Sequence, residues 1–82
     1  MTSSVIKKMI DNFSDNISDQ YESFTYTSSE NTYNNSAIDH EVTFVMKNGE
    51  KYQMRHTVGN VGMCFNFAIY KFDTSSDKWN RI

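Results

Sequence analysis

The stretch Met63-Cys-Phe-Asn-Phe-Ala-Ile-Tyr-Lys-Phe72 is the most apolar run of the chain, and it decides the fold. Aromatic and β-branched residues dominate it, as they do in β-strands. Wound as a helix, this run would be apolar on almost every side, and a domain of 82 residues has no interior large enough to hide such a helix. We therefore predict a strand, and we expect it to be the central strand of a small sheet.

Strand alternation divides this segment between two faces. One face is wholly apolar and is expected to point into the core. Its members are Met63, Phe65, Phe67 and Ile69. The other face begins small and polar and ends aromatic. Its members are Cys64, Asn66, Ala68, Tyr70 and Phe72. The aromatic end of this second face is the first indication of a contact surface.

The N-terminal part is expected to form an amphipathic helix that ends near Gln20. Its apolar residues recur at spacings of three and four, which places them on one stripe of a helix. They are Ile6, Met9, Ile10, Phe13, Ile17 and Tyr21. Ser3 or Ser4 is suited to cap the start of this helix, because a serine hydroxyl can accept a hydrogen bond from the first free backbone N–H groups.

From Glu22 the pattern changes to an alternation of Phe24 and Tyr26 with polar residues, which predicts a strand prone to lie at an edge. Residues 28–36 have the polar composition of a loop, and Asn34-Asn35 is well suited to a turn.

Residues 38–58 predict a β-hairpin whose register follows from its apolar residues, most of which stand at even positions. A two-residue Asn48-Gly49 turn would pair even positions with odd ones and divide the apolar residues between both faces. A three-residue loop, Lys47-Asn48-Gly49 with Gly49 left-handed, keeps them on one face. The expected pairs are Phe44 with Tyr52, Val42 with Met54 and Ile38 with Val58, and on the other face Glu41 with Arg55 and Thr43 with Gln53.

Two further turns are expected, over 59–62 and over 73–77, and a short strand over 78–82 follows the second. Pairing across that turn sets Asp73 with Lys78, Phe72 with Trp79, Tyr70 with Arg81 and Ile69 with Ile82, which puts Ile82 on the core face. The predicted fold class is α+β: one N-terminal amphipathic helix packed on an antiparallel sheet of four to five strands, in a single domain over 1–82.

Composition argues against several classes of function. The net charge is -2, and the basic residues form no run longer than Lys7-Lys8, so we expect no direct binding to nucleic acid. One cysteine allows no disulfide within the chain and suits a reducing compartment. The N-terminal segment has no uninterrupted apolar stretch, so we expect neither a signal peptide nor a membrane span, and a cytoplasmic location.

No motif for catalysis is present: there is no Gly-rich phosphate loop, no nucleophile elbow, no metalloprotease helix and no Cys-x-x-Cys pair. His40 and His56 lie opposite each other in the predicted hairpin, and with Cys64 they are the only candidates for a zinc site or a nucleophile. Two histidines alone make an incomplete site, so we expect ordinary histidines near the margin of the sheet. We predict no enzyme, no metal and no cofactor.

Two groups of residues are candidates for binding a partner. The first is an acidic ridge on the polar side of the helix, formed by Asp11, Asp15, Asp19 and Glu22. Acidic residues at this spacing repel mildly, so the ridge is interpreted either as a solvated face or as a contact with a basic surface. If it meets a basic partner, neutralising it should slow association and flatten its salt dependence.

The second group is an aromatic face formed by Tyr70, Phe72, Trp79 and Arg81. Tyrosine, tryptophan and arginine dominate interface hot spots, and one helix can cover only one face of a sheet. The alternative interpretation is a second small cluster, in which Trp79 and Phe72 pack with Tyr26 or Tyr33, and Arg81 lies on an aromatic ring.

These features favour a non-enzymatic intracellular protein-protein binding module. The absence of proline and the abundance of Asn, Ser and Thr resemble translation of AT-rich DNA, as in many phages and some bacteria. The leading hypothesis is therefore a phage-encoded inhibitor, in the manner of an anti-CRISPR protein, that occludes a larger protein or nucleoprotein complex of the host cell. The alternative is a small structural or self-assembling subunit that forms a homodimer through the same aromatic face.

Overall fold

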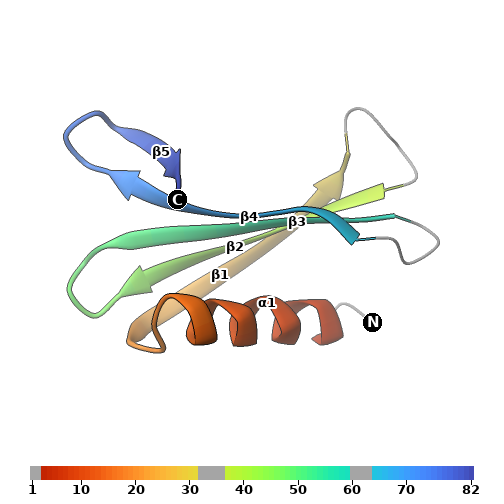
Figure 1. Ribbon diagram of the computed structural model, residues 1–82, viewed down its shortest axis with the longest axis horizontal. Coiled ribbons are helices and arrows are strands. Elements are labelled where there is room, and N and C mark those ends of the chain that lie inside the picture. Colours follow the sequence, from red (N-terminus) through yellow and green to blue (C-terminus); the bar gives the residue numbers. More distant parts are fainter. Residues whose placement is uncertain (1–2, 32–36, 60–63) are drawn as a thin grey trace.

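The computed structural model describes residues 3–31, 37–59 and 64–82, and side chains are described except at Ser3 and at residues 64–66. One helix packs on a five-stranded antiparallel sheet, which confirms the predicted α+β class (Figure 1). In order, the elements are α1 (Ser3–Asn16), β1 (Tyr21–Glu30), β2 (Ala37–Met46), β3 (Lys51–Gly59), β4 (Cys64–Asp73) and β5 (Lys78–Arg81). The strands lie in the sheet in the order of the sequence, so each strand pairs with the one before it.

The core lies between α1 and the middle of the sheet. Met9 and Phe13 of α1 are fully buried against Val42, Phe44 and Met54 of β2 and β3. The ring of Phe13 stacks on that of Phe44, with centroids 3.9 Å apart and planes 6° apart. The helix is amphipathic because its apolar residues recur every three or four positions, and that stripe is the side that meets the sheet.

The helix ends at Asn16, earlier than the predicted end near Gln20. The carbonyl of Phe13 accepts hydrogen bonds from the backbone N–H groups of both Ile17 (2.8 Å) and Ser18 (3.2 Å), which closes the last turn. The Gln20 carbonyl then accepts from the N–H of Lys47 (3.1 Å), so the chain already joins the sheet at the position where the helix was expected to stop.

Strand β1 is longer than predicted, because residues 28–30 extend it although their composition is typical of a loop. Three successive residues of β2 pair with Ser28, Ser29 and Glu30. Backbone hydrogen bonds to β2 therefore make a strand of residues whose polar side chains are typical of a loop. The remainder of the predicted loop, including Tyr33 and Asn34-Asn35, lies outside the described residues.

The β2–β3 hairpin has the predicted register, including Phe44 opposite Tyr52 and Glu41 opposite Arg55. The N–H of Met46 donates to the carbonyl of Glu50 (2.8 Å), which leaves a three-residue loop. Gly49 has a φ of 90°, and a Cβ atom there would meet nothing within 4 Å. Backbone conformation rather than crowding is therefore the reason for glycine at this position.

The β4–β5 hairpin also has the predicted register, with Phe72 opposite Trp79 and Tyr70 opposite Arg81. Two other predictions for this region are wrong. The strand that begins at Cys64 is the fourth of the sheet and not the central one, a place that β3 takes. Ile82 pairs with Ile69 as predicted, since its N–H donates to the Ile69 carbonyl (3.0 Å), but it does not join the core, because 61% of it is exposed. The predicted turn residues 60–62 and Met63 lie outside the described residues.

None of the helices in the described ranges has the length and apolar character that crossing a lipid bilayer requires.

Candidate functional site

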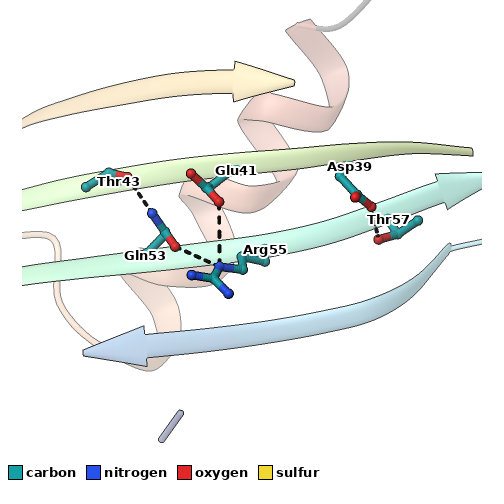
Figure 2. Close-up of polar contacts among 6 residues, drawn as sticks. All are labelled: Asp39, Glu41, Thr43, Gln53, Arg55 and Thr57. Atoms are coloured by element: carbon teal, nitrogen blue, oxygen red, sulfur yellow. Dashed lines mark hydrogen bonds and ion pairs between the residues drawn. The ribbon is translucent and has the colours of Figure 1, made fainter. Parts of the chain in front are cut away.

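The candidate site is the face of the sheet turned away from α1, called the open face below. The odd-numbered residues of β2 and β3 point to this side, because they alternate with core residues such as Val42 and Met54. Figure 2 shows six of them: Asp39, Glu41, Thr43, Gln53, Arg55 and Thr57. Two of these six, Gln53 and Thr57, are nevertheless buried among their neighbours, at 6% and 4% exposed. No helix or strand of the described residues packs over this face, since α1 is the only helix there and it lies on the other side (Figure 1).

A chain of polar contacts holds the middle of the open face in one arrangement. Gln53 Nε2 donates to Thr43 Oγ1 (3.0 Å), and Gln53 Oε1 accepts from Arg55 Nε (2.7 Å) (Figure 2). The same Nε atom lies 3.6 Å from Glu41 Oε2. A glutamine fixed at both ends cannot rotate freely, so it holds the guanidinium of Arg55 in one position.

The guanidinium of Arg55 lies over the ring of Tyr70, with the Cζ atom 4.2 Å from the ring centroid. The residue of β4 directly opposite Arg55 is Ala68, whose small side chain leaves room for the guanidinium to reach Tyr70. A cation over an aromatic ring is attracted by about 0.5–1 kcal/mol where water has access. The contact joins the polar centre of the open face to its aromatic end.

A second set of polar contacts lies farther along β2 and β3. Asp39 Oδ1 accepts from Thr57 Oγ1 (2.6 Å) and from Asn31 Nδ2 (2.9 Å). These two hydrogen bonds, that of Thr57 foremost, hold the pKa of Asp39 below its ordinary value, since they favour the charged carboxylate. Asp39 thus stays ionised and ties the end of β1 to β3.

The aromatic end of the open face contains the four residues predicted for it. Phe72 and Trp79 touch edge to face, with ring centroids 5.1 Å apart and planes 64° apart. Both are only half-buried, whereas Arg81 is exposed and has no ion pair within the described part of the chain. A depression of about 780 Å³ extends from Arg81 and Tyr70 past Arg55 toward β1, and neither Phe72 nor Trp79 lines it.

The alternative prediction for this face, a second closed cluster, is wrong in two respects, and its version with Tyr33 lies outside the described residues. Tyr26 lies on β1, three strands away from β4, and contacts His40 instead of Trp79. Among the described residues, the guanidinium that lies over an aromatic ring is that of Arg55 and not that of Arg81.

Sequence reasoning placed Arg55 and Gln53 on this face but did not include them in the site. The signal that could have added them was the hairpin register itself, which sets each beside a polar partner on the same face.

The structure divides the predicted acidic ridge. Asp11 and Asp15 are exposed on α1, but Asp19 follows the helix and Glu22 lies in β1, where the register shifts. Asp11 is also paired with Lys7, at 2.8 Å. Because α1 lies on the side of the sheet opposite the open face, the helical carboxylates and the aromatic residues cannot meet the same flat surface of a partner.

His40 and His56 are opposite each other, as predicted, but they are buried on the helix side and are not marginal. They are only 6% and 4% exposed. His40 Nδ1 lies 2.6 Å from Tyr26 Oη, and the ring of His56 meets the edge of Phe67 at 4.7 Å between centroids. No group of three or more potential metal ligands occurs among the side chains that the structure describes, which do not include that of Cys64. Their burial makes the two histidine side chains part of the core.

Burial lowers the pKa of both histidines below the ordinary value of 6.5, and nearby Lys8 lowers that of His56 further. The unfolded chain therefore binds these protons at a higher pH than the folded chain does. Protonation of the histidines in the unfolded chain therefore lowers the free energy of unfolding as the pH falls below about 6.5, and above that pH it has little effect.

We expect the urea concentration at the midpoint of unfolding to decrease when the pH is lowered from 7.5 to 5. His56→Leu should make this decrease smaller. The ordinary pKa of Asp39 is 3.8, and its pKa in the folded chain is lower still, so Asp39 affects stability only at lower pH. It does not account for a change of stability between pH 7.5 and pH 5. Equal midpoints at both pH values would show that neither histidine is buried in its neutral form.

Comparisons with known proteins gave no match to a family model, to a curated protein or to a solved structure.

Proposed function

We propose that this chain is a non-enzymatic protein-binding module that docks on a larger intracellular protein or nucleoprotein complex through the open face of its sheet. The observation that carries the proposal is the aromatic end of that face. It gathers Tyr70, Phe72, Trp79 and Arg81 on two paired strands, with no described element covering them. Aromatic residues and arginine are the types that contribute most of the binding energy at protein interfaces.

The chemistry of the site suggests what the partner must offer. Phe72 and Trp79 present half-buried rings, which an apolar pocket would cover completely. Arg81 is an exposed guanidinium, and a carboxylate of the partner would pair with it. Arg55 already has Glu41 and Tyr70 as neighbours, so its role is to support the ring of Tyr70 from one side.

The finer form of the proposal is inhibition by occlusion. A small domain that binds through one face of its β-sheet can cover a functional site of a larger protein without any catalytic chemistry of its own. A phage-encoded inhibitor of a host or defence complex, in the manner of an anti-CRISPR protein, would act in this way in the cytoplasm of the host cell. Support for the phage origin comes only from the composition of the sequence.

Aromatic and arginine side chains on a sheet can also bind single-stranded nucleic acid. Here the net charge of -2 and the pairing of Arg55 with Glu41 favour a protein partner. Trp79 is the only tryptophan, so its fluorescence reports on this face alone. We expect single-stranded DNA and RNA oligonucleotides to leave that fluorescence unchanged.

Photocrosslinking in cells tests the proposal, because it captures a partner whose identity is still open. A photoreactive amino acid at position 81 on the open face is expected to form a covalent adduct with one larger protein. The matched control carries the same group at position 15, exposed on α1. If only the control forms an adduct, the acidic side of the helix is the interface and the open face is not.

A further inference from the structure

The sheet has two edges, and they differ in length and charge. Strand β5 is only four residues long and carries Lys78 and Arg81. Strand β1 is ten residues long, and its only charges are Glu22 and Glu30 near its ends. Short edge strands, lysines, prolines and bulges are the usual means of preventing a free edge from pairing with another chain. Strand β5 has two of these features, whereas β1 has a single register shift at its start.

The backbone pattern identifies which groups of β1 face the free edge. The N–H of Asn31 donates to the carbonyl of Ala37, so this pair is hydrogen-bonded across β1 and β2. Hydrogen-bonded and non-bonded pairs alternate along an antiparallel ladder. The odd residues of β1 therefore bond to β2, and the N–H and C=O groups of Phe24, Tyr26 and Ser28 point outward.

Phe24 gives a second reason to expect an occupant at this edge. It is 43% exposed, one of the few large apolar side chains of the described residues to be exposed at all. It lies on the helix side of the sheet, where its ring meets those of Tyr21 and Phe44, but α1 packs over β2 and β3 and leaves the rest of it exposed. An apolar ring beside a row of free backbone groups is typical of a site to which a strand is added.

We propose that β1 pairs with β1 of a second copy of this chain, antiparallel and centred on Thr25, so that the two five-stranded sheets become one continuous sheet. Antiparallel pairing of one strand with its own copy is a two-fold symmetric contact, the commonest symmetry of protein dimers. Centring on Thr25 sets the outward backbone N–H and C=O groups of Phe24 opposite those of the partner's Tyr26, so hydrogen bonds can form between the two strands.

The side chains favour this register. Phe24 meets the partner's Tyr26 on the helix side, twice by symmetry, and aromatic cross-strand pairs of this kind are among the favourable ones. Glu22 faces the partner's Ser28. Centring one residue later, on Tyr26, would set Glu22 against the partner's Glu30 at both ends, and like charges directly opposite each other are destabilising.

The dimer has a consequence for binding. A two-fold axis perpendicular to the sheet places both helices on one side and both open faces on the other. The two aromatic ends then lie at the far ends of one surface, so a partner with two copies of its own site would be bound twice. The dimer itself does not depend on the proposed function, because β1 lies at the edge opposite the aromatic end.

Light scattering coupled to size-exclusion chromatography tests the association. The wild-type chain is expected to have twice the mass of 9.6 kDa. Thr25→Lys should give a monomer, because two ammonium groups would face each other at the centre, and so should Thr25→Glu. Mixing these two variants should restore a dimer. Asn80→Lys, at the exposed edge of β5, is the matched control and should leave the wild-type dimer intact.

Three results would overturn the proposal. They are a wild-type monomer at every concentration at which the chain stays in solution, a dimer that survives Thr25→Lys, and a dimer that is lost instead in Trp79→Ala. The last would place the interface on the aromatic end of the open face.

Cysteine crosslinking tests the register, in a Cys64→Ser background that removes the native thiol. In this register Thr25 lies opposite Thr25 of the second copy as a pair without backbone hydrogen bonds. Such pairs have Cα atoms about 4.5 Å apart, within the range that a disulfide can bridge. Thr25→Cys should therefore oxidise to a covalent dimer. Thr27→Cys is the control, since two such residues would lie about 13 Å apart. Crosslinking of Thr27→Cys without that of Thr25→Cys would contradict the register.

Discussion

Replacing Phe13 by alanine is expected to lower the free energy of unfolding by about 3 to 5 kcal/mol. The side chain is fully buried, stacks on Phe44, and meets Tyr21 and Tyr52 edge on. Alanine favours the helix more than phenylalanine does, so any loss must come from packing. Because domains of this kind are stable by only about 5 to 15 kcal/mol, the variant loses much of its stability.

Urea denaturation followed by circular dichroism measures this effect. Asp15→Ala is the matched control, because Asp15 is exposed on the same helix and its replacement should change the free energy by less than about 0.5 kcal/mol. Equal midpoints for Phe13→Ala and the control would show that α1 does not pack on the sheet as described.

Trp79→Ala is expected to weaken binding to the partner found by crosslinking by at least about 2 kcal/mol, roughly thirtyfold in Kd. Its effect on the thermal midpoint should be small, because the indole is half-buried and contacts Phe72 on a face that nothing described covers. The lost contacts are those formed only in the complex. Titration with the purified partner and a thermal melt of the free chain measure the two quantities.

Asn80→Ala is the matched control, since Asn80 adjoins Trp79 on β5 and alternates to the other side of the sheet. It should leave both binding and stability unchanged. The opposite result for Trp79→Ala, with a loss of about 3 to 5 kcal/mol of stability and retained binding, would mean that the indole belongs to a core and that the interface lies elsewhere.

The sequence alone determined the local parts of this fold. Apolar spacing indicated the helix, and period-two alternation indicated the strands. The loop Lys47-Asn48-Gly49 and the turn from Asp73 determined the registers of two hairpins, because a short turn allows only one register that keeps the apolar residues together. Those registers were enough to place Tyr70, Phe72, Trp79 and Arg81 on one face without any tertiary information.

Only the tertiary structure decided the features that depend on contacts distant in sequence. Residues 28–30 form a strand because β2 supplies their hydrogen bonds, and the helix ends early because Gln20 bonds to Lys47. Hydrophobicity did not reveal that β3 is central, since strand order depends on which edges pair and not on how apolar each strand is. The contact of Arg55 with Tyr70 and the separation of the acidic residues from the aromatic end likewise require side chains placed in three dimensions. Local propensity reflects interactions within a few residues, whereas these features depend on long-range pairing and packing, which become definite only when the whole sheet has formed.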